Sequence, residues 1–193
     1  MKTNPTRYVI SVLIADRPGI LRDITATVSA LGANIDGIRQ TVVAGYFTVM
    51  LTASLPETCL PEALQARMLK SFTPGEASIT VVPYESRKVR SESEADRYMV
   101  TLTGEDHTGI LKAVTQFFAE RGINIEDWNV EFLGNHITHV GQVSIPKPLD
   151  IKQIQVEFRH LADTLNLHGA IQHEFIFRAI NEIGPIRHLL SSS

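Results

Sequence analysis

The amino-acid sequence contains one segment twice, at an offset of 90 residues. Residues 7–40 and 97–130 align without a gap. The identical positions are Arg7, Tyr8, Asp16, Gly19, Ile20, Leu21, Thr25, Gly32, Asn34 and Ile35, which recur as Arg97, Tyr98, Asp106, Gly109, Ile110, Leu111, Thr115, Gly122, Asn124 and Ile125. Each half of the chain is long enough to form a small domain. We therefore expect two copies of one module.

The pattern of the first copy predicts a strand, a helix, a hairpin of two strands, a second helix and a final strand. The expected ranges are 8–14, 20–31, 35–43 with 46–53, 61–72 and 77–82. Apolar residues fall on one stripe of each helix at helical spacing. These stripes are Ile20, Leu21, Ile24, Val28 and Leu31, and then Ala63, Leu64, Met68, Leu69 and Phe72. Pro18 suits the first turn of the first helix, and Gly32 is expected to end it.

The second copy repeats this order. Its expected ranges are 98–103, 108–121, 125–133 with 136–145, 150–166 and 170–179. The first of its helices carries Ile110, Leu111, Val114, Phe117 and Phe118 on its predicted inner face. In the last strand, alternate residues are apolar or aromatic from Ile171 to Phe177, a period that is typical of a strand.

The order βαββαβ predicts an α+β fold, in which each copy is a ferredoxin-like unit with an antiparallel sheet and both helices on one face. We expect the first domain over residues 5–84, a charged and exposed linker over 85–96, and the second domain over 97–182. The strands at the sheet edges would stay open for pairing. We therefore expect the protein to self-associate, as a dimer or a larger homo-oligomer.

Composition argues against several classes of function. The chain of 193 residues has a formal net charge of −3, whereas a nucleic-acid binder would show a basic stripe. Its single cysteine, Cys59, cannot form an internal disulfide, which is typical of a reducing compartment. No apolar run reaches the roughly 20 residues of a membrane-spanning helix, and no secretory signal is recognisable. These features predict a soluble cytoplasmic protein that contacts neither nucleic acid nor membrane.

Two short motifs resemble the signature of ACT domains, the small-molecule-sensing modules of amino-acid metabolism. The first copy has Asp16-Arg17-Pro18-Gly19-Ile20-Leu21 followed by Gly32-Ala33-Asn34-Ile35. The second has Asp106-His107-Thr108-Gly109-Ile110-Leu111 followed by Gly122-Ile123-Asn124-Ile125. A chain of two such domains is similar to the glycine cleavage system transcriptional repressor family. The resemblance implies a regulator that acts through a DNA-binding activator of the LysR type and does not touch DNA itself.

The motif also has a physical interpretation as an amino-acid clamp. A glycine at the strand-to-helix turn lets a ligand approach the backbone closely. Free N–H groups at the start of a helix favour a carboxylate, and Asp16 or Asp106 could accept a hydrogen bond from an amino group. Asn34 and Asn124 are expected to face the loop and supply an amide. The candidate ligand-binding residues are Asp16, Arg17, Pro18, Gly19, Ile20, Leu21, Asn34 and Ile35, with Asp106, His107, Thr108, Gly109, Ile110, Leu111, Asn124 and Ile125.

Each of these residues also has a purely structural explanation. Asp16 and Asp106 could cap their helices, an interaction worth roughly 0.5–2 kcal/mol without any ligand. The glycines could serve only a turn, and the asparagines could be turn residues. The second copy departs from the motif at His107 and Thr108, so the first copy is favoured if only one loop binds a ligand.

The seven histidines do not predict a metal site. His136 and His139 are three residues apart in a predicted strand, so their side chains point to opposite faces. The other histidines lack the spacing of zinc ligands. His107 could titrate near neutral pH within the candidate loop, or could be an ordinary exposed histidine. We expect no metal and no cofactor.

The sequence has no Ser-His-Asp arrangement, nucleotide-binding loop or paired carboxylates, so we expect no catalytic residues. The first hypothesis is a non-enzymatic regulator that senses an amino acid and modulates transcription through a protein partner. The alternatives are a regulatory subunit of an amino-acid metabolic enzyme, and a ligand-free interaction module.

Overall fold

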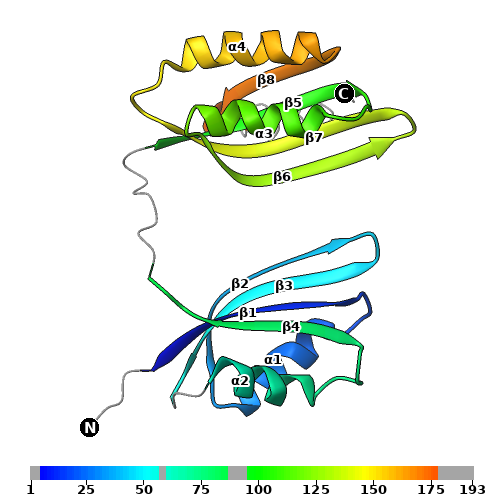
Figure 1. Ribbon diagram of the computed structural model, residues 1–193, viewed down its shortest axis with the longest axis vertical. Helices are drawn as coiled ribbons and strands as arrows, with labels where there is room; N and C mark the ends of the chain where they lie inside the picture. Colours follow the sequence, from blue (N-terminus) through cyan, green and yellow to red (C-terminus); the bar gives the residue numbers. More distant parts are fainter. Residues whose placement is uncertain (1–4, 57–59, 87–94, 178–193) are drawn as a thin grey trace, which may run out of the picture. The chain divides into compact units, whose positions relative to one another are not determined.

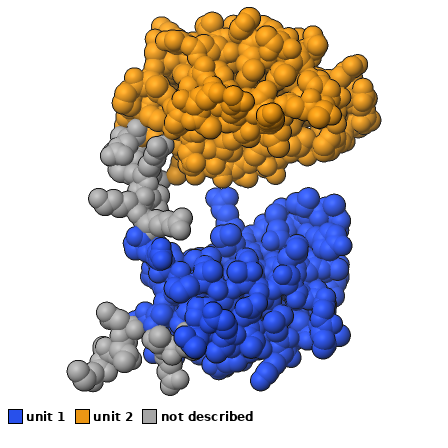
Figure 2. Space-filling model, viewed as in Figure 1, with its two compact units in different colours: residues 1–87 blue, residues 88–193 orange. Residues whose placement is uncertain are grey.

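Two βαββαβ units follow each other along the chain (Figure 1). The computed structural model describes residues 5–56, 60–86 and 95–177, and the chain divides into unit 1, residues 1–87, and unit 2, residues 88–193 (Figure 2). Unit 1 comprises β1 (Thr6–Ala15), α1 (Ile20–Ala30), β2 (Asn34–Val43), β3 (Tyr46–Leu55), α2 (Pro61–Leu69) and β4 (Ala77–Pro83). Unit 2 comprises β5 (Ala95–Glu105), α3 (Ile110–Glu120), β6 (Asn124–Leu133), β7 (His136–Pro146), α4 (Ile151–Thr164) and β8 (Leu167–His173).

Each unit has one four-stranded antiparallel sheet. The strand orders are β2-β3-β1-β4 and β6-β7-β5-β8, which are the same topology. In each unit both helices cover one face of the sheet (Figure 1). This arrangement confirms the predicted α+β class and the two ferredoxin-like units.

The cores lie between the helices and the covered face of each sheet. In β1, the side chains of Tyr8, Ile10, Val12 and Ile14 are buried at every second position, as expected for a half-buried strand. Unit 2 has more aromatic side chains at its centre. Phe118 stacks on Phe158 with ring centroids 5.5 Å apart, and Phe117 meets both rings edge to face, at 5.4 and 5.6 Å.

Glycine ends the first helix of each unit in the same way. Gly32 and Gly122 have φ of +70° and +64°, and the N–H of each donates to the carbonyl oxygen three residues earlier, at 2.9 and 3.0 Å. The N–H of the next residue donates to the carbonyl five residues before it. This pair of bonds is the Schellman motif, which confirms that Gly32 ends its helix and shows that Gly122, its counterpart in the repeat, does the same.

The structure corrects several expectations about individual elements. Pro18 lies before α1, because the helix begins only at Ile20, after Gly19. Four residues assigned to inner helical faces are exposed instead, namely Leu21, Ala63, Leu69 and Leu111. The last strand begins earlier and ends at His173, and residues 174–177 are helical. The apolar alternation from Ile171 therefore overestimated the length of this strand, since its pairing with β5 stops at Tyr98 and His173 and the chain then turns into a helix.

Some expectations lie outside the described residues. These are the environment of Cys59, most of the linker predicted over 85–96, and the chain from residue 178 onward, which includes the expected end of the second domain at 182. Within the described ranges, no helix is long and apolar enough to cross a membrane.

Candidate functional site

The two candidate loops join the first strand of each unit to its first helix. We call residues 16–19 loop 1 and residues 106–109 loop 2. Each loop is tied to the hairpin of its own unit at the same place: the N–H of Asp16 donates to the carbonyl oxygen of Gly45 (2.8 Å), and the N–H of Asp106 donates to that of Asn135 (2.9 Å). The repeated sequence therefore folds into a repeated loop.

A glycine in the left-handed conformation ends each loop. Gly19 has φ +90° and Gly109 has φ +102°, and each is the N-cap residue of the helix that follows. L-residues adopt this conformation only with strain, so the turn favours glycine. A Cβ atom at Gly109 would meet nothing within 4 Å. Glycine is therefore favoured at this position by the backbone conformation alone and not by lack of space.

Neither helix has a side-chain cap among the described residues. The structural alternative that Asp16 and Asp106 cap α1 and α3 is therefore wrong, because the helices begin four residues later. Both aspartates are exposed. The N–H groups of the first helical turn have no intrahelical acceptor, and they remain available to an anionic group in front of the helix.

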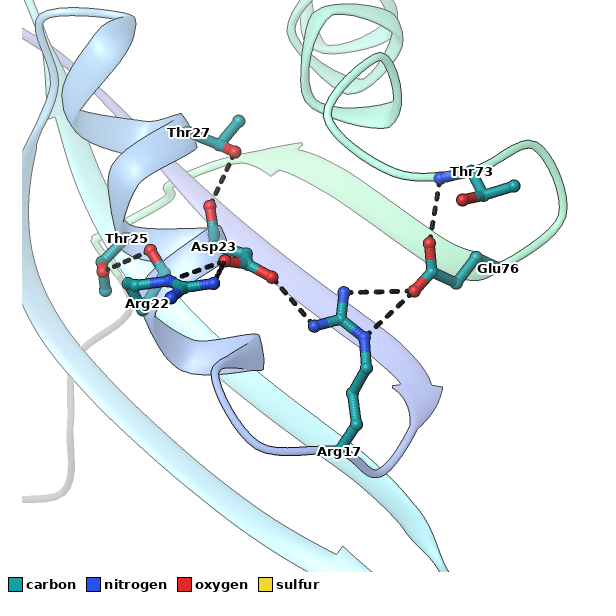
Figure 3. A network of polar contacts seen from close by, with 7 residues as sticks. All are labelled: Arg17, Arg22, Asp23, Thr25, Thr27, Thr73 and Glu76. Carbon is teal, nitrogen blue, oxygen red and sulfur yellow. Dashed lines mark hydrogen bonds and ion pairs between the residues drawn. The ribbon is translucent and has the colours of Figure 1, made fainter.

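The side chain of Arg17 lies between Asp23 and Glu76 and contacts both (Figure 3). Its Nη1 lies 2.9 Å from Oδ2 of Asp23 in α1. Its Nη2 lies 3.1 Å from Oε1 of Glu76, just before β4. Glu76 is held in turn by the backbone N–H of Thr73, at 2.9 Å. Loop 1 is thus attached by one charge pair to α1 and by another to the connection between α2 and β4.

The charges of this network reinforce one another. The pKa of the Glu76 carboxyl is lowered, first by the Thr73 N–H and then by Arg17. The pKa of the Asp23 carboxyl is lowered by hydrogen bonds from Arg22 and then from Arg17. Both acids are therefore ionised at neutral pH, and the guanidinium cannot lose its proton in this range.

His107 takes the place of Arg17 in loop 2 and reaches the equivalent connection of unit 2. Its Nε2 lies 2.8 Å from the carbonyl oxygen of Leu165, the C-cap residue of α4. Its Nδ1 lies 3.3 Å from the carbonyl oxygen of Thr108. The pKa of the imidazole is raised, mainly by the Leu165 carbonyl and then by that of Thr108.

The structure does not bring Asn34 and Asn124 to the loops, contrary to expectation. Asn34 pairs with Ser54, which in turn pairs with Arg7 at the start of β1, whereas loop 1 follows the other end of that strand at Ala15. Eight residues of strand separate the two positions by about 25 Å. Asn124 has the same place in unit 2.

These asparagines instead bind an acidic side chain at a β-bulge. The Nδ2 of Asn34 donates to Asp36 at 2.9 Å, and the hydroxyl of Ser54 donates to the same carboxylate. In unit 2, Asn124 and the hydroxyl of Ser144 both donate to Glu126 at 2.7 Å. The register shifts at this point in each sheet. The asparagines therefore have a structural role at the far end of the sheet, shared by both copies.

The apolar members of the candidate set separate into two groups. Ile20 and Ile110 belong to the cores, while Leu21 and Leu111 are 38% and 47% exposed at the first turn of α1 and α3. Ile35 and Ile125 pack against the cores near the bulges. Of these six residues, only the two leucines have exposed side chains next to the loops.

Sequence reasoning missed the residues that hold the loops, Glu76 and Leu165. They lie 59 and 58 positions from their partners, so no local pattern identified them. At the offset of 90, Glu76 corresponds to Asn166, the neighbour of Leu165. The repeat could therefore have indicated that both loops contact the connection between the second helix and the last strand of their unit.

A polar pair inside unit 2 was also missed. Trp128 donates from Nε1 to Nδ1 of His139 at 3.1 Å, and the Nε2 of this buried histidine has no hydrogen-bond partner among the described residues. His136 is exposed, so the two histidines do lie on opposite faces, as predicted. In the described part of the chain no three His, Cys, Asp or Glu side chains form a metal-binding group.

A cavity of about 400 Å³ lies away from loop 2, between the C-terminal end of α3 and the N-terminal end of α4. Arg121 and Glu157 line it and are already paired, with Nη2 of the arginine 2.9 Å from the glutamate. The cavity therefore does not belong to the candidate loops.

Family models match both units. The ACT domain model matches residues 8–57, and a second ACT domain model matches residues 97–172. Among curated proteins, a UPF0237 protein of Streptococcus mutans is 34% identical over 85 residues, which are 44% of this chain and 97% of the relative. A UPF0237 protein of Corynebacterium glutamicum is 34% identical over 86 residues, with the same coverage.

Two solved structures share the fold over most of the chain. An unknown protein from Galdieria sulphuraria has a TM-score of 0.73 at 20% identity and covers 88% of this chain and 98% of its own. A provisionally identified glycine cleavage system transcriptional repressor has a TM-score of 0.61 at 21% identity, with the same coverage. At this level of identity the similarity establishes the fold alone.

Proposed function

This chain belongs to the ACT-domain family, and from that membership we propose that it is a non-enzymatic regulator that binds a small amino acid at its loops and acts on a protein partner. The observation that carries the proposal is the pair of loops: each ends in a left-handed glycine and opens onto an uncapped helix. A capping side chain would stabilise each helix further. The lack of one at the start of both α1 and α3 therefore favours a role for these helix ends beyond that of a turn.

The loops offer complementary groups to the head group of an amino acid. The first N–H groups of α1 and α3 would receive the carboxylate, helped by the helix dipole. The carboxylates of Asp16 and Asp106 accept no hydrogen bond from any described residue, and they would receive the ammonium group. Leu21 and Leu111 would contact the side chain or the remainder of the ligand.

Two features support signalling through a protein rather than through DNA. The net charge of −3 opposes binding to the phosphate backbone. A protein that shares the fold carries the name glycine cleavage system transcriptional repressor. We therefore propose a transcription activator, such as one of the LysR type, as the partner and glycine as the first ligand to test.

A thermal-shift screen of the full chain against the twenty amino acids tests the ligand. A ligand that binds only the native fold adds about 2.7 kcal/mol of stability at one hundred times its dissociation constant. We expect a shift that disappears in Asp16→Ala or Asp106→Ala and persists in Asp163→Ala, an exposed aspartate of α4. The absence of any shift would leave only the ligand-free interaction module.

A pull-down with the full chain, with and without the ligand from the screen, tests the partner. Ligand-dependent retention of a LysR-type activator would support the transcriptional role. Retention of a metabolic enzyme whose activity changes on binding would instead favour the regulatory subunit. Open edge strands, β2 and β4 in unit 1 and β6 and β8 in unit 2, also support self-association, which light scattering at several concentrations would measure.

A further inference from the structure

The two loops are attached to equivalent connections of their units by different chemical interactions. Loop 1 is attached to the α2–β4 connection by the ion pair of Arg17 and Glu76. Loop 2 is attached to the α4–β8 connection by the hydrogen bond between His107 and Leu165. The first pair needs no proton from solution, since Arg17 is permanently charged. The second depends on a side chain that titrates near neutral pH.

We propose that His107 is a protonation-dependent positioning residue of loop 2, which holds the loop on the α4–β8 connection more firmly when charged than when neutral, while Arg17 holds loop 1 at every physiological pH. The consequence for ligand binding rests on the function proposed above. The attachment itself is independent of that function.

The geometry at His107 favours the charged form. Both ring nitrogens face carbonyl oxygens, of Leu165 at 2.8 Å and of Thr108 at 3.3 Å. An imidazolium donates from both nitrogens, whereas neutral imidazole has one N–H and one lone pair. A neutral ring must therefore direct its lone pair at one of the two carbonyl oxygens or turn away from it.

The end of α4 adds to this preference. Leu165 is the C-cap of a helix of 14 residues, and carbonyl groups at a helix C-terminus carry partial negative charge and lack intrahelical donors. A cation placed there both satisfies a carbonyl and interacts favourably with the helix dipole. Loss of the proton from His107 removes the interaction with the helix dipole, and the one N–H that remains can satisfy only one of the two carbonyl oxygens.

The ionisable groups on the elements that meet loop 2 do not reverse this effect. They are Glu105 and Asp106, which precede His107 in the chain, Lys112 in α3, His136 on β7, Asp163 in the last turn of α4 and His168 on β8. Among them, Asp106 raises the pKa of His107 by its negative charge. The raised pKa agrees with the geometry, because both hydrogen-bond contacts of the ring are with carbonyl oxygens.

The consequence is a difference between the two candidate sites. As pH rises through the pKa of His107, the attachment of loop 2 to the α4–β8 connection weakens and its uncapped helix end becomes less well positioned for a carboxylate. Loop 1 stays attached over the same range. One chain would then carry one site whose attachment is independent of pH and one whose ligand affinity falls as pH rises through the pKa of His107.

The attachment can be tested in the full chain without a ligand. Amide hydrogen exchange of Asp106 and Ala113, whose N–H groups donate to Asn135 and Gly109, is measured from pH 6 to pH 9 and corrected for the intrinsic pH dependence, and the His107 ring is titrated by NMR. We expect protection of these amides to fall several-fold at the pH where His107 titrates. The equivalent amides of unit 1, Asp16 and Asp23, donate to Gly45 and Gly19 and are the internal control, and their protection stays constant.

Three variants make the test specific. His107→Gln keeps a neutral donor and His107→Arg installs the residue of loop 1, so both abolish the pH dependence of loop 2. Arg17→His transfers a pH dependence to loop 1. Unchanged protection of loop 2 across this range, or an unchanged pH dependence in His107→Arg, would overturn the proposal.

Ligand binding separates this inference from the proposed function. With glycine as the first probe, and any amino acid that shifts the melting temperature as the next, titrations at pH 6 and pH 9 should show weaker binding at loop 2 only at the higher pH. Failure of every amino acid to bind would refute sensing, while the exchange experiment would still decide the attachment. If the amide exchange of loop 2 changes with pH but the ligand affinity is equal at both pH values, the coupling between His107 and the site is refuted.

Discussion

Trp128 donates its indole N–H to Nδ1 of His139 across 3.1 Å, and this bond requires the histidine to be neutral. Nδ1 can accept only as a lone pair, so the proton of the neutral ring lies on Nε2. Unit 1 has Ile38 and Val49 at the corresponding positions. The pair is therefore a polar feature of unit 2 alone, built into the sheet face that the helices cover.

Unit 2 should lose stability in mild acid because of His139. Burial lowers the pKa of this imidazole from its ordinary value of 6.5, so the unfolded chain binds more protons than the folded one between the two pKa values. The contribution of His139 to the free energy of unfolding is therefore fully present above pH 6.5. It is lost as pH falls from 6.5 to the folded-state pKa, by at most about 1.4 kcal/mol per pH unit for one proton.

The measurement is urea unfolding from pH 5 to pH 8, followed by the fluorescence of Trp128, the single tryptophan of the chain. His107 contributes with the opposite sign, since its raised pKa gives stability that is lost at higher pH. The comparison is therefore made between His107→Gln and the double variant His107→Gln with His139→Val. An identical pH dependence in both would show that His139 is not responsible.

Gly141 should resist replacement because the indole of Trp128 lies directly over it. A Cβ atom at this position would come within 2.1 Å of Cε3 of Trp128, so Gly141→Ala must displace the indole. Such overpacking costs about 1–3 kcal/mol. In the Trp128→Ile background, which restores the residue of unit 1, the same substitution should cost much less. Calorimetric unfolding of the four proteins measures the difference, and additive effects would contradict the clash.

Gly109 should be required for its conformation and not for space. Gly109→Ala has room for its methyl group, but the backbone has φ +102°, and an L-residue in left-handed conformation costs roughly 1–2 kcal/mol. Asparagine tolerates this region better, so Gly109→Asn should recover part of the loss. Urea unfolding followed by Trp128 fluorescence compares them, and an alanine variant as stable as wild type would show that the conformation is not needed.

Arg17→Ala should raise the pKa of the Glu76 carboxyl, but not to its ordinary value of 4.5, because the Thr73 N–H is the larger cause of its depression. The pKa of Asp23 should rise too, while its bonds to Arg22 persist. Both depressed pKa values mean stability that is present above the ordinary pKa and lost as pH falls through the folded one. NMR titration of the side-chain carboxyl carbons measures this, and Arg39→Ala, an exposed arginine of β2, is the control. An unchanged Glu76 titration would contradict the ion pair.

Much of the fold could be predicted from the sequence because its signals are local. Alternating burial in β1 and the helical stripe through Ile24 and Val28 follow from the period of each element. Gly32 and Gly122 end their helices through bonds that span only five residues. The hairpin turns at Gly45 and Gly134 are equally local, and the offset of 90 residues then carried every one of these predictions from one unit to the other.

The tertiary structure alone decided which side chains surround the loops. The antiparallel register and one β-bulge place Asn34 at the far end of the sheet from Asp16, and a period of two does not reveal where a strand is paired. Arg17 meets Glu76, and His107 meets Leu165, only because β4 and β8 return beside β1 and β5. The sequence by itself determined two ACT-type units and their loops. The chemistry that attaches each loop depended on contacts nearly 60 residues apart in the chain, for which a single sequence has no periodic signal.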